Sequence, residues 1–111
     1  MQAEIIPIPP PARTLQPGEA RGRFRAGGRE WGVDRASSAR NGNEEEIGLY
    51  AGDELVAIVN IDARGMVSLR TAAGFVTAPD VTVDIRQTTN GWIGRITWSE
   101  GQLVFHVLSS R

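Results

Sequence analysis

The chain has 111 residues, a formal net charge of −1 and no cysteine. This length is typical of one domain with a modest core, and the absence of thiols excludes disulfides and thiolate zinc sites. No run approaches the roughly 18 apolar residues of a membrane helix, so we expect no membrane segment and a location in the cytoplasm or in a virion.

Residues 1–19 predict an extended, proline-rich arm. Proline fixes φ and lacks an amide proton, so this stretch favours neither a helix nor a central strand. Pro7 and Pro10 also have the spacing of a Pro-x-x-Pro ligand. Three isoleucines in the arm need an apolar surface on the same chain or on a neighbour. The residues that we expect to dock are Ile5, Ile6, Pro7, Ile8, Pro9 and Pro10.

Residues 20–111 predict a single all-β domain, because apolar residues recur with period two between glycine turns. We expect a long loop over residues 34–46. The fold class is an antiparallel β-sandwich, or a small, partly open barrel, of about seven to nine short strands. The predicted strands span residues 21–26, 29–33, 47–51, 54–61, 66–71, 75–77, 81–88, 92–99 and 102–109.

Two hairpins give the clearest local signals. Gly27-Gly28 can supply the positive φ of a tight turn, and Asn90-Gly91 is a strong hairpin signal.

The strand after Asn90-Gly91 places Trp92 and Trp98 on one face with Ile96, which favours core packing over an exposed sugar platform formed with Trp31. The strands at 55–61 and 103–108 are apolar on both faces, so each should lie between layers or under a partner.

The charges divide along the chain, although all twelve basic residues are arginine. Residues 13–40 hold seven arginines against three carboxylates, whereas residues 41–111 hold five against nine. Opposite charges on neighbouring copies attract one another. We therefore expect an interface in which a row of arginines faces acidic residues such as Glu44, Glu45 and Glu46. The arginines of this row are Arg21, Arg23 and Arg25.

No residue pattern indicates catalysis, a metal or a cofactor. The single histidine, His106, lies in an apolar strand, and no Gly-x-Ser-x-Gly elbow accompanies it. The oxygens of residues 41–46 and of Asp62 do not match a calcium loop. We expect a structural, partly buried histidine and a protein that is not an enzyme.

Nucleic-acid binding is an alternative, because arginines alternate with aromatic residues near the start of the domain. Guanidinium groups neutralise phosphates and aromatic rings stack on unpaired bases. The sequence pI of about 5.8 argues against it. Period two also places Phe24 on the face opposite the arginines. The residues of this alternative are Arg21, Arg23, Phe24, Arg25, Arg29 and Trp31.

These patterns together favour a non-enzymatic structural or assembly subunit, such as a shell or tail component of a virion, whose arm docks on a neighbouring subunit. The expected partner is a protein: copies of this chain or a larger lattice. One alternative is a β-barrel module that binds single-stranded nucleic acid. Another is a small regulator or inhibitor that binds one protein target. The preference for assembly rests on fold-level analogy.

Overall fold

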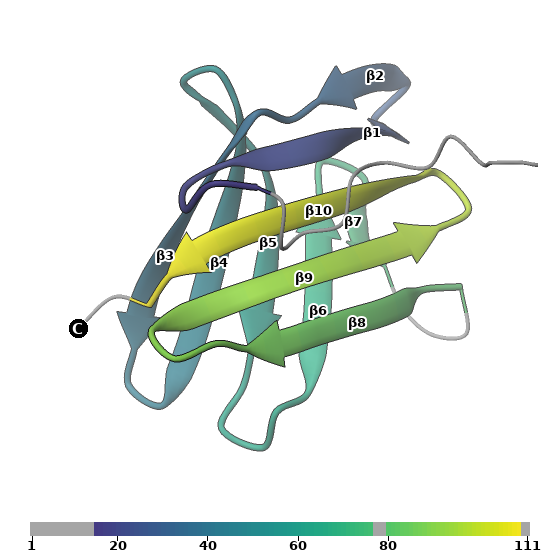
Figure 1. The fold of residues 1–111 in the computed structure, drawn as a ribbon. Coiled ribbons are helices and arrows are strands. Elements are labelled where there is room, and N and C mark those ends of the chain that lie inside the picture. Colours follow the sequence, from purple (N-terminus) through teal and green to yellow (C-terminus); the bar gives the residue numbers. More distant parts are fainter. Residues whose placement is uncertain (1–14, 77–79, 110–111) are drawn as a thin grey trace, which may run out of the picture.

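The protein is an antiparallel β-sandwich of two five-stranded sheets, seen in a computed structural model that describes residues 15–76 and 80–109 (Figure 1). The predicted sandwich is confirmed, with ten strands instead of seven to nine, and no closed barrel forms over these residues. One sheet has the order β2-β1-β10-β9-β8 and the other β3-β4-β5-β6-β7. The strands are β1 (Ala20–Ala26), β2 (Arg29–Gly32), β3 (Arg35–Asn41), β4 (Glu44–Ala51), β5 (Glu54–Ile61), β6 (Val67–Thr71), β7 (Gly74–Val76), β8 (Thr82–Gln87), β9 (Gly91–Trp98) and β10 (Gly101–Leu108).

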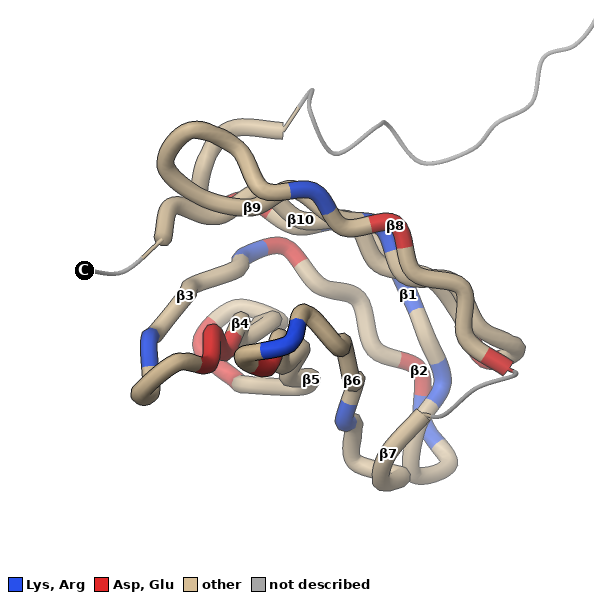
Figure 2. The backbone as a smooth tube through the Cα atoms, turned by 90° about the horizontal axis from the view of Figure 1, so that it is seen from below, with Lys and Arg blue, Asp and Glu red and all other residues tan. Residues whose placement is uncertain are grey.

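The second sheet is a simple meander, whereas the first joins the two ends of the described chain. Strands β3 to β7 pair in sequence order, and β1 pairs antiparallel with β10 so that Ala20 faces Phe105. The strands of the two sheets cross at a steep angle in Figure 1. Figure 2, seen from below, shows β8, β9 and β10 in one layer and β4, β5 and β6 in the other.

The core lies between the sheets and follows the period-two pattern of the sequence. Phe24 is 1% exposed, and its ring centroid lies 5.6 Å from that of Trp98. Trp98 and Ile96 are buried, and Trp92 packs against the same cluster. The prediction that this face of β9 is core is therefore confirmed. The largest fully buried side chains are Phe24, Phe105, Ile47, Leu49, Leu69, Ile96, Leu103, Val59, Val104 and Val107.

The predicted loop over residues 34–46 is wrong. Strand β3 occupies residues 35–41 and pairs with β4 from Arg35–Tyr50 to Asn41–Glu44. The Asn41-Gly42 pair begins the hairpin turn, with Gly42 at a φ of +64°. Since β3 is an edge strand with small and polar side chains, its sequence lacks the alternation of apolar residues that marks the other strands.

The Asn90-Gly91 hairpin joins β8 to β9, but its glycine serves a different purpose. Gly91 is not among the glycines with a positive φ, and it lies inside β9 opposite Leu108. A Cβ atom at position 91 would lie 2.0 Å from the carbonyl oxygen of Val107. This glycine therefore permits the close approach of β9 and β10, which any side chain would disturb.

Candidate functional site

The predicted interface arginines form an exposed row along β1. Arg21, Arg23 and Arg25 alternate with residues that face the core, and all three are exposed. Arg23 lies 4.0 Å from Glu30, but both side chains are more than half exposed, so this ion pair contributes little to stability. The row is visible as blue segments on β1 in Figure 2. The other predicted interface residues, Ile5, Ile6, Pro7, Ile8, Pro9 and Pro10, lie outside the described residues.

The residues of the nucleic-acid alternative do not share one face. Phe24 is buried in the core, so its ring cannot stack on a base. Trp31 is half-buried, and the guanidinium carbon of Arg29 lies 3.8 Å from its ring centroid. Phe24 therefore offers no ring to a base beside the arginine row. Arg29 already covers one face of the Trp31 ring.

The acidic surface that we expected opposite the arginines must be corrected. Glu45 is only 4% exposed and cannot contribute to an interface. Its carboxylate accepts hydrogen bonds from the hydroxyl of Ser38, from Arg40 at 3.5 Å and from the Ser109 hydroxyl at 3.3 Å. Glu45 therefore ties β3 and β4 to the end of β10, because it points inward between the sheets. Glu44 and Glu46, on the opposite face of β4, remain half-buried.

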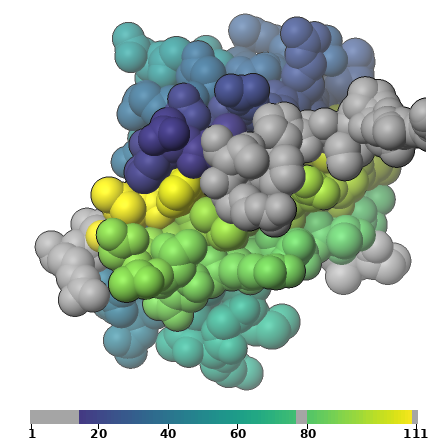
Figure 3. Space-filling view, in the orientation of Figure 1, coloured from purple at the N-terminus to yellow at the C-terminus, as the bar shows by residue number. Residues whose placement is uncertain are grey.

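His106 is partly buried, as its position in the sequence predicts. Its ring is half-buried, and Nδ1 lies 2.8 Å from the carbonyl oxygen of Leu15. Figure 3 shows the purple residues at the start of the described chain packed beside yellow β10. Within residues 15–76 and 80–109, no three acidic or histidine side chains gather as a metal site would require.

The outer faces of both sheets carry apolar side chains. On β10, outward-facing Val104 is fully buried and Leu108 is 49% exposed. On the β3–β7 sheet, one row runs across four strands through the pairs Gly48–Ile58, Ile58–Arg70 and Arg70–Phe75. The neighbouring pair Tyr50–Leu55 lies on the same face. Leu55 is 46% exposed and Phe75 66% exposed, so this face presents apolar surface to solvent. We call Tyr50, Leu55, Ile58 and Phe75 the apolar row.

Arginines accompany the aromatic rings of the apolar row. The guanidinium carbon of Arg35 lies 4.0 Å from the Tyr50 ring centroid, and that of Arg70 lies 6.0 Å from the Phe75 ring centroid. Stacked guanidinium groups contribute about 0.5–1 kcal/mol at exposed sites. The sequence pattern did not predict this surface. Its one signal is the second apolar face of residues 55–61, which predicted either a second layer or a covering partner.

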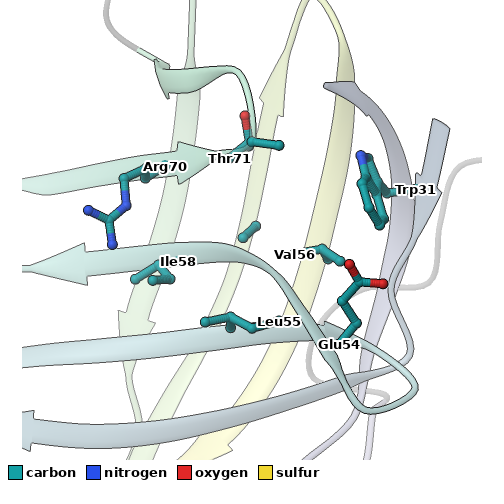
Figure 4. A pocket seen from close by; sticks show the side chains of 9 residues that line it. Trp31, Glu54, Leu55, Val56, Ile58, Arg70 and Thr71 are labelled. Atoms are coloured by element: carbon teal, nitrogen blue, oxygen red, sulfur yellow. The ribbon is translucent and has the colours of Figure 1, made fainter. Parts of the chain in front are cut away.

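A notch lies at one end of the apolar row, between the two sheets. It has a volume of about 240 Å³ and opens where β6 ends (Figure 4). Figure 4 shows Trp31 from β2 on one side, the start of β5 below, and Arg70 and Thr71 from β6 on the other side. The lining residues are Trp31, Glu54, Leu55, Val56, Ala57, Ile58, Arg70, Thr71 and Ala72.

Comparisons with protein-family models, with curated proteins and with solved structures find no match for this chain. The described residues contain no helix long and apolar enough to cross a membrane. The surfaces of the sandwich are therefore the features from which a function can be inferred.

Proposed function

We propose that the protein is a non-enzymatic assembly subunit that binds other protein subunits through its N-terminal arm and an apolar surface of the sandwich. The observation that carries this proposal is the exposed apolar row on the β3–β7 sheet. Contiguous exposed apolar surface on a small domain marks interaction sites. Exposing Leu55 and Phe75 to water has no benefit for an isolated domain.

The chain itself supplies a ligand of matching chemistry. Residues 5–10 read Ile-Ile-Pro-Ile-Pro-Pro. Burial of each isoleucine contributes about 1.5–3 kcal/mol before the cost of ordering the arm. Proline lowers that cost, because it restricts the free chain beforehand. The shell or tail of a virion is a setting in which such arms link copies, and a cytoplasmic complex is the other.

The exposed arginine row adds an electrostatic component to this proposal. Arg21, Arg23 and Arg25 would face acidic residues of the neighbour, with Glu44 and Glu46 as candidates once buried Glu45 is set aside. Exposed ion pairs guide encounter more than they add affinity, and salt screens them. Assembly should therefore weaken moderately, but not disappear, at high salt.

Light scattering on the intact chain and on a chain without residues 1–12 tests the proposal. We expect the intact chain to form a closed oligomer or a larger particle and the shortened chain to be a monomer. The full-length variant with Asp in place of Ile5, Ile6 and Ile8 should also be monomeric. If the shortened chain assembles like the intact one, or if both are monomers at low and high salt, the proposal is wrong.

One observation favours a second candidate, a module that binds single-stranded nucleic acid: the three arginines of β1 lie in line on an open face. This candidate predicts that the affinity for an oligonucleotide falls steeply as the salt concentration rises.

The other alternative, a regulator of one protein target, predicts a monomer that forms a one-to-one complex with that target.

A further inference from the structure

The notch exists because β6 is shorter than the strand beside it. The pairing of β5 with β6 begins at Ala57–Thr71, and the chain then turns through Ala72 toward β7. The first three residues of β5, Glu54 to Val56, therefore have no strand neighbour on that side. A gap of this kind can accept an extended segment from elsewhere, as peptides that dock at sheet edges do.

The walls of the notch suit an apolar, proline-rich segment. Trp31 forms one side, and its indole N–H donates to the carbonyl oxygen of Ala26 at 3.1 Å. Arg29 covers one face of the ring, so the indole is held from two directions. The side chains of Leu55, Val56 and Ile58 line the other sides (Figure 4). A fixed aromatic ring beside apolar walls is the type of groove in which proline-rich segments bind.

The size of the notch also favours a peptide over a small molecule. Its volume of about 240 Å³ is below the range of roughly 300–1,000 Å³ that is usual for small-molecule and cofactor sites. The apolar row continues from the notch through Leu55 and Ile58, so a longer segment would find further contacts along the sheet.

The arm can reach such a notch on another copy. Residues 5–10 precede Leu15 by five to ten positions, and at about 3.1 Å per residue in a polyproline conformation this tether would span about 16–31 Å. At Pro10 the tether is about half of either shorter dimension of the molecule, 34 Å and 30 Å. Leu15 is bound to His106 on the outer face of β10, whereas most of the residues that line the notch come from β5 and β6 of the other sheet. A short tether that starts on this outer face favours the notch of a neighbouring copy.

Charge adds a second point of fit. Glu4 directly precedes the apolar segment of the arm. Arg70 lines the notch and Arg29 lies beside it, and within the described ranges neither arginine forms an ion pair with a carboxylate. Glu54 also lines the notch, on the side of Trp31, and Arg70 lies at the other end (Figure 4). A carboxylate that arrives with the arm would therefore be attracted to the end that holds Arg70.

We propose that the notch between Trp31 and β5 receives residues 5–10 of a second copy of this chain. This inference rests on the proposed assembly function and specifies its receptor. Trp31 contacts the prolines, and Leu55, Val56 and Ile58 contact the isoleucines.

A binding experiment on the full-length chain tests the site directly. The protein carries Ile5→Asp, Ile6→Asp and Ile8→Asp, so that its own arm cannot compete, and the ligand is a synthetic peptide of residues 1–12. Nitrogen-15 NMR follows the indole N–H signals of the three tryptophans, and the Trp31→Phe variant identifies that of Trp31. We expect a saturable shift of the Trp31 signal and smaller changes at buried Trp98.

Two leucines provide a matched pair for this experiment. Leu55 is 46% exposed beside the notch, and Leu108 is 49% exposed on the opposite sheet. Leu55→Asp should weaken peptide binding by about tenfold or more, whereas Leu108→Asp should not change it. Ala72→Glu, in an exposed turn at the rim, should weaken binding similarly without altering β5. Dispersed NMR spectra establish that each variant is folded.

Light scattering is then repeated with the same substitutions in the chain that has its native arm. It distinguishes a failure of the notch proposal from a failure of the assembly proposal. Loss of assembly in Leu55→Asp but not in Leu108→Asp supports the notch. Arm-dependent assembly that survives Leu55→Asp and Ala72→Glu, without a Trp31 shift, overturns the notch but leaves the assembly function standing. A native chain that stays monomeric while its own arm shifts Trp31 overturns docking on a second copy. A monomer without that shift overturns both proposals.

Discussion

Nδ1 of His106 lies 2.8 Å from the carbonyl oxygen of Leu15, which joins two residues 91 positions apart. A carbonyl oxygen only accepts, so Nδ1 carries the proton in this contact. The backbone of His106 holds the same segment twice more, since its carbonyl accepts from Gly18 at 2.7 Å and its amide donates to Glu19 at 3.1 Å. The segment that leads from the arm into β1 is therefore fastened along β10.

His106→Ala should loosen this attachment without unfolding the sandwich. The loss of one hydrogen bond to a half-buried ring predicts a decrease of about 0.5–1.5 kcal/mol in the free energy of unfolding. Hydrogen exchange at the Gly18 amide should become faster, because the segment opens more often. Urea titration and exchange measurements check both effects. Equal exchange at Gly18 in the variant and the native chain would show that the imidazole contact holds nothing in place.

Glu45→Ala should be clearly destabilising. The substitution leaves the inward-facing hydroxyl of Ser38 and the hydroxyl of Ser109 without their acceptor. Removing one partner of a buried hydrogen-bonded set costs about 1–3 kcal/mol. Glu46→Ala is the control, since Glu46 lies on the other face of β4. Urea denaturation should show little change for Glu46→Ala, about 0.5 kcal/mol or less. Equal effects would contradict the assignment of Glu45 as a link between the sheets.

Gly91→Ala tests the close approach of β9 and β10. The added Cβ would lie 2.0 Å from a backbone oxygen that cannot rotate away, so the strands must separate. We expect a loss of about 1–3 kcal/mol in the free energy of unfolding. At Gly32 the nearest atom to an added Cβ is 4.0 Å away, so Gly32→Ala should be nearly neutral. Thermal unfolding of the two variants side by side decides whether strand contact is the reason for the glycine.

The arginine row separates the two leading functions. Replacing Arg21, Arg23 and Arg25 by Gln removes three exposed charges from one face of β1. Under the assembly proposal, the association measured by light scattering should become less sensitive to salt but should persist. Under the nucleic-acid alternative, fluorescence anisotropy with a labelled single-stranded oligonucleotide should show lost binding and a shallower salt dependence. No oligonucleotide binding by the native chain at low salt would exclude that alternative.

The sequence predicted most of the sandwich because the residue types along most strands indicate which positions are buried. Alternating apolar residues located β1, β8 and β9, runs that are apolar on both faces located β5 and β10, and glycine-containing turns separated several of these strands. Strand β3 was missed, since its inward positions hold Ala36, Ser38 and Arg40, which carry no apolar period. An edge strand with small residues on both faces resembles a loop until its pairing partner is known.

The candidate site was less accessible to prediction, because its residues meet only in three dimensions. Trp31 comes from the first sheet, whereas Leu55 and Ile58 come from the second. The notch between them depends on where β6 stops relative to β5, and strand ends are the least certain feature of a sequence pattern. The apolar second face of β5 was the one visible signal, and it indicated a second layer or a covering partner without showing which.

The pairing of the first strand with the last has a consequence for how the protein is made. Strands β3 to β7 form their ladders with neighbours in the chain, so the pairing of these strands with one another needs nothing synthesised later. Strand β1 has the short β2 as its other neighbour, and it must wait for β10 to complete its ladder. Contacts this distant in sequence form slowly. During translation, β1 and its arginine row would thus stand open until the last strand leaves the ribosome, and only then could the segment that carries the arm be fastened to His106.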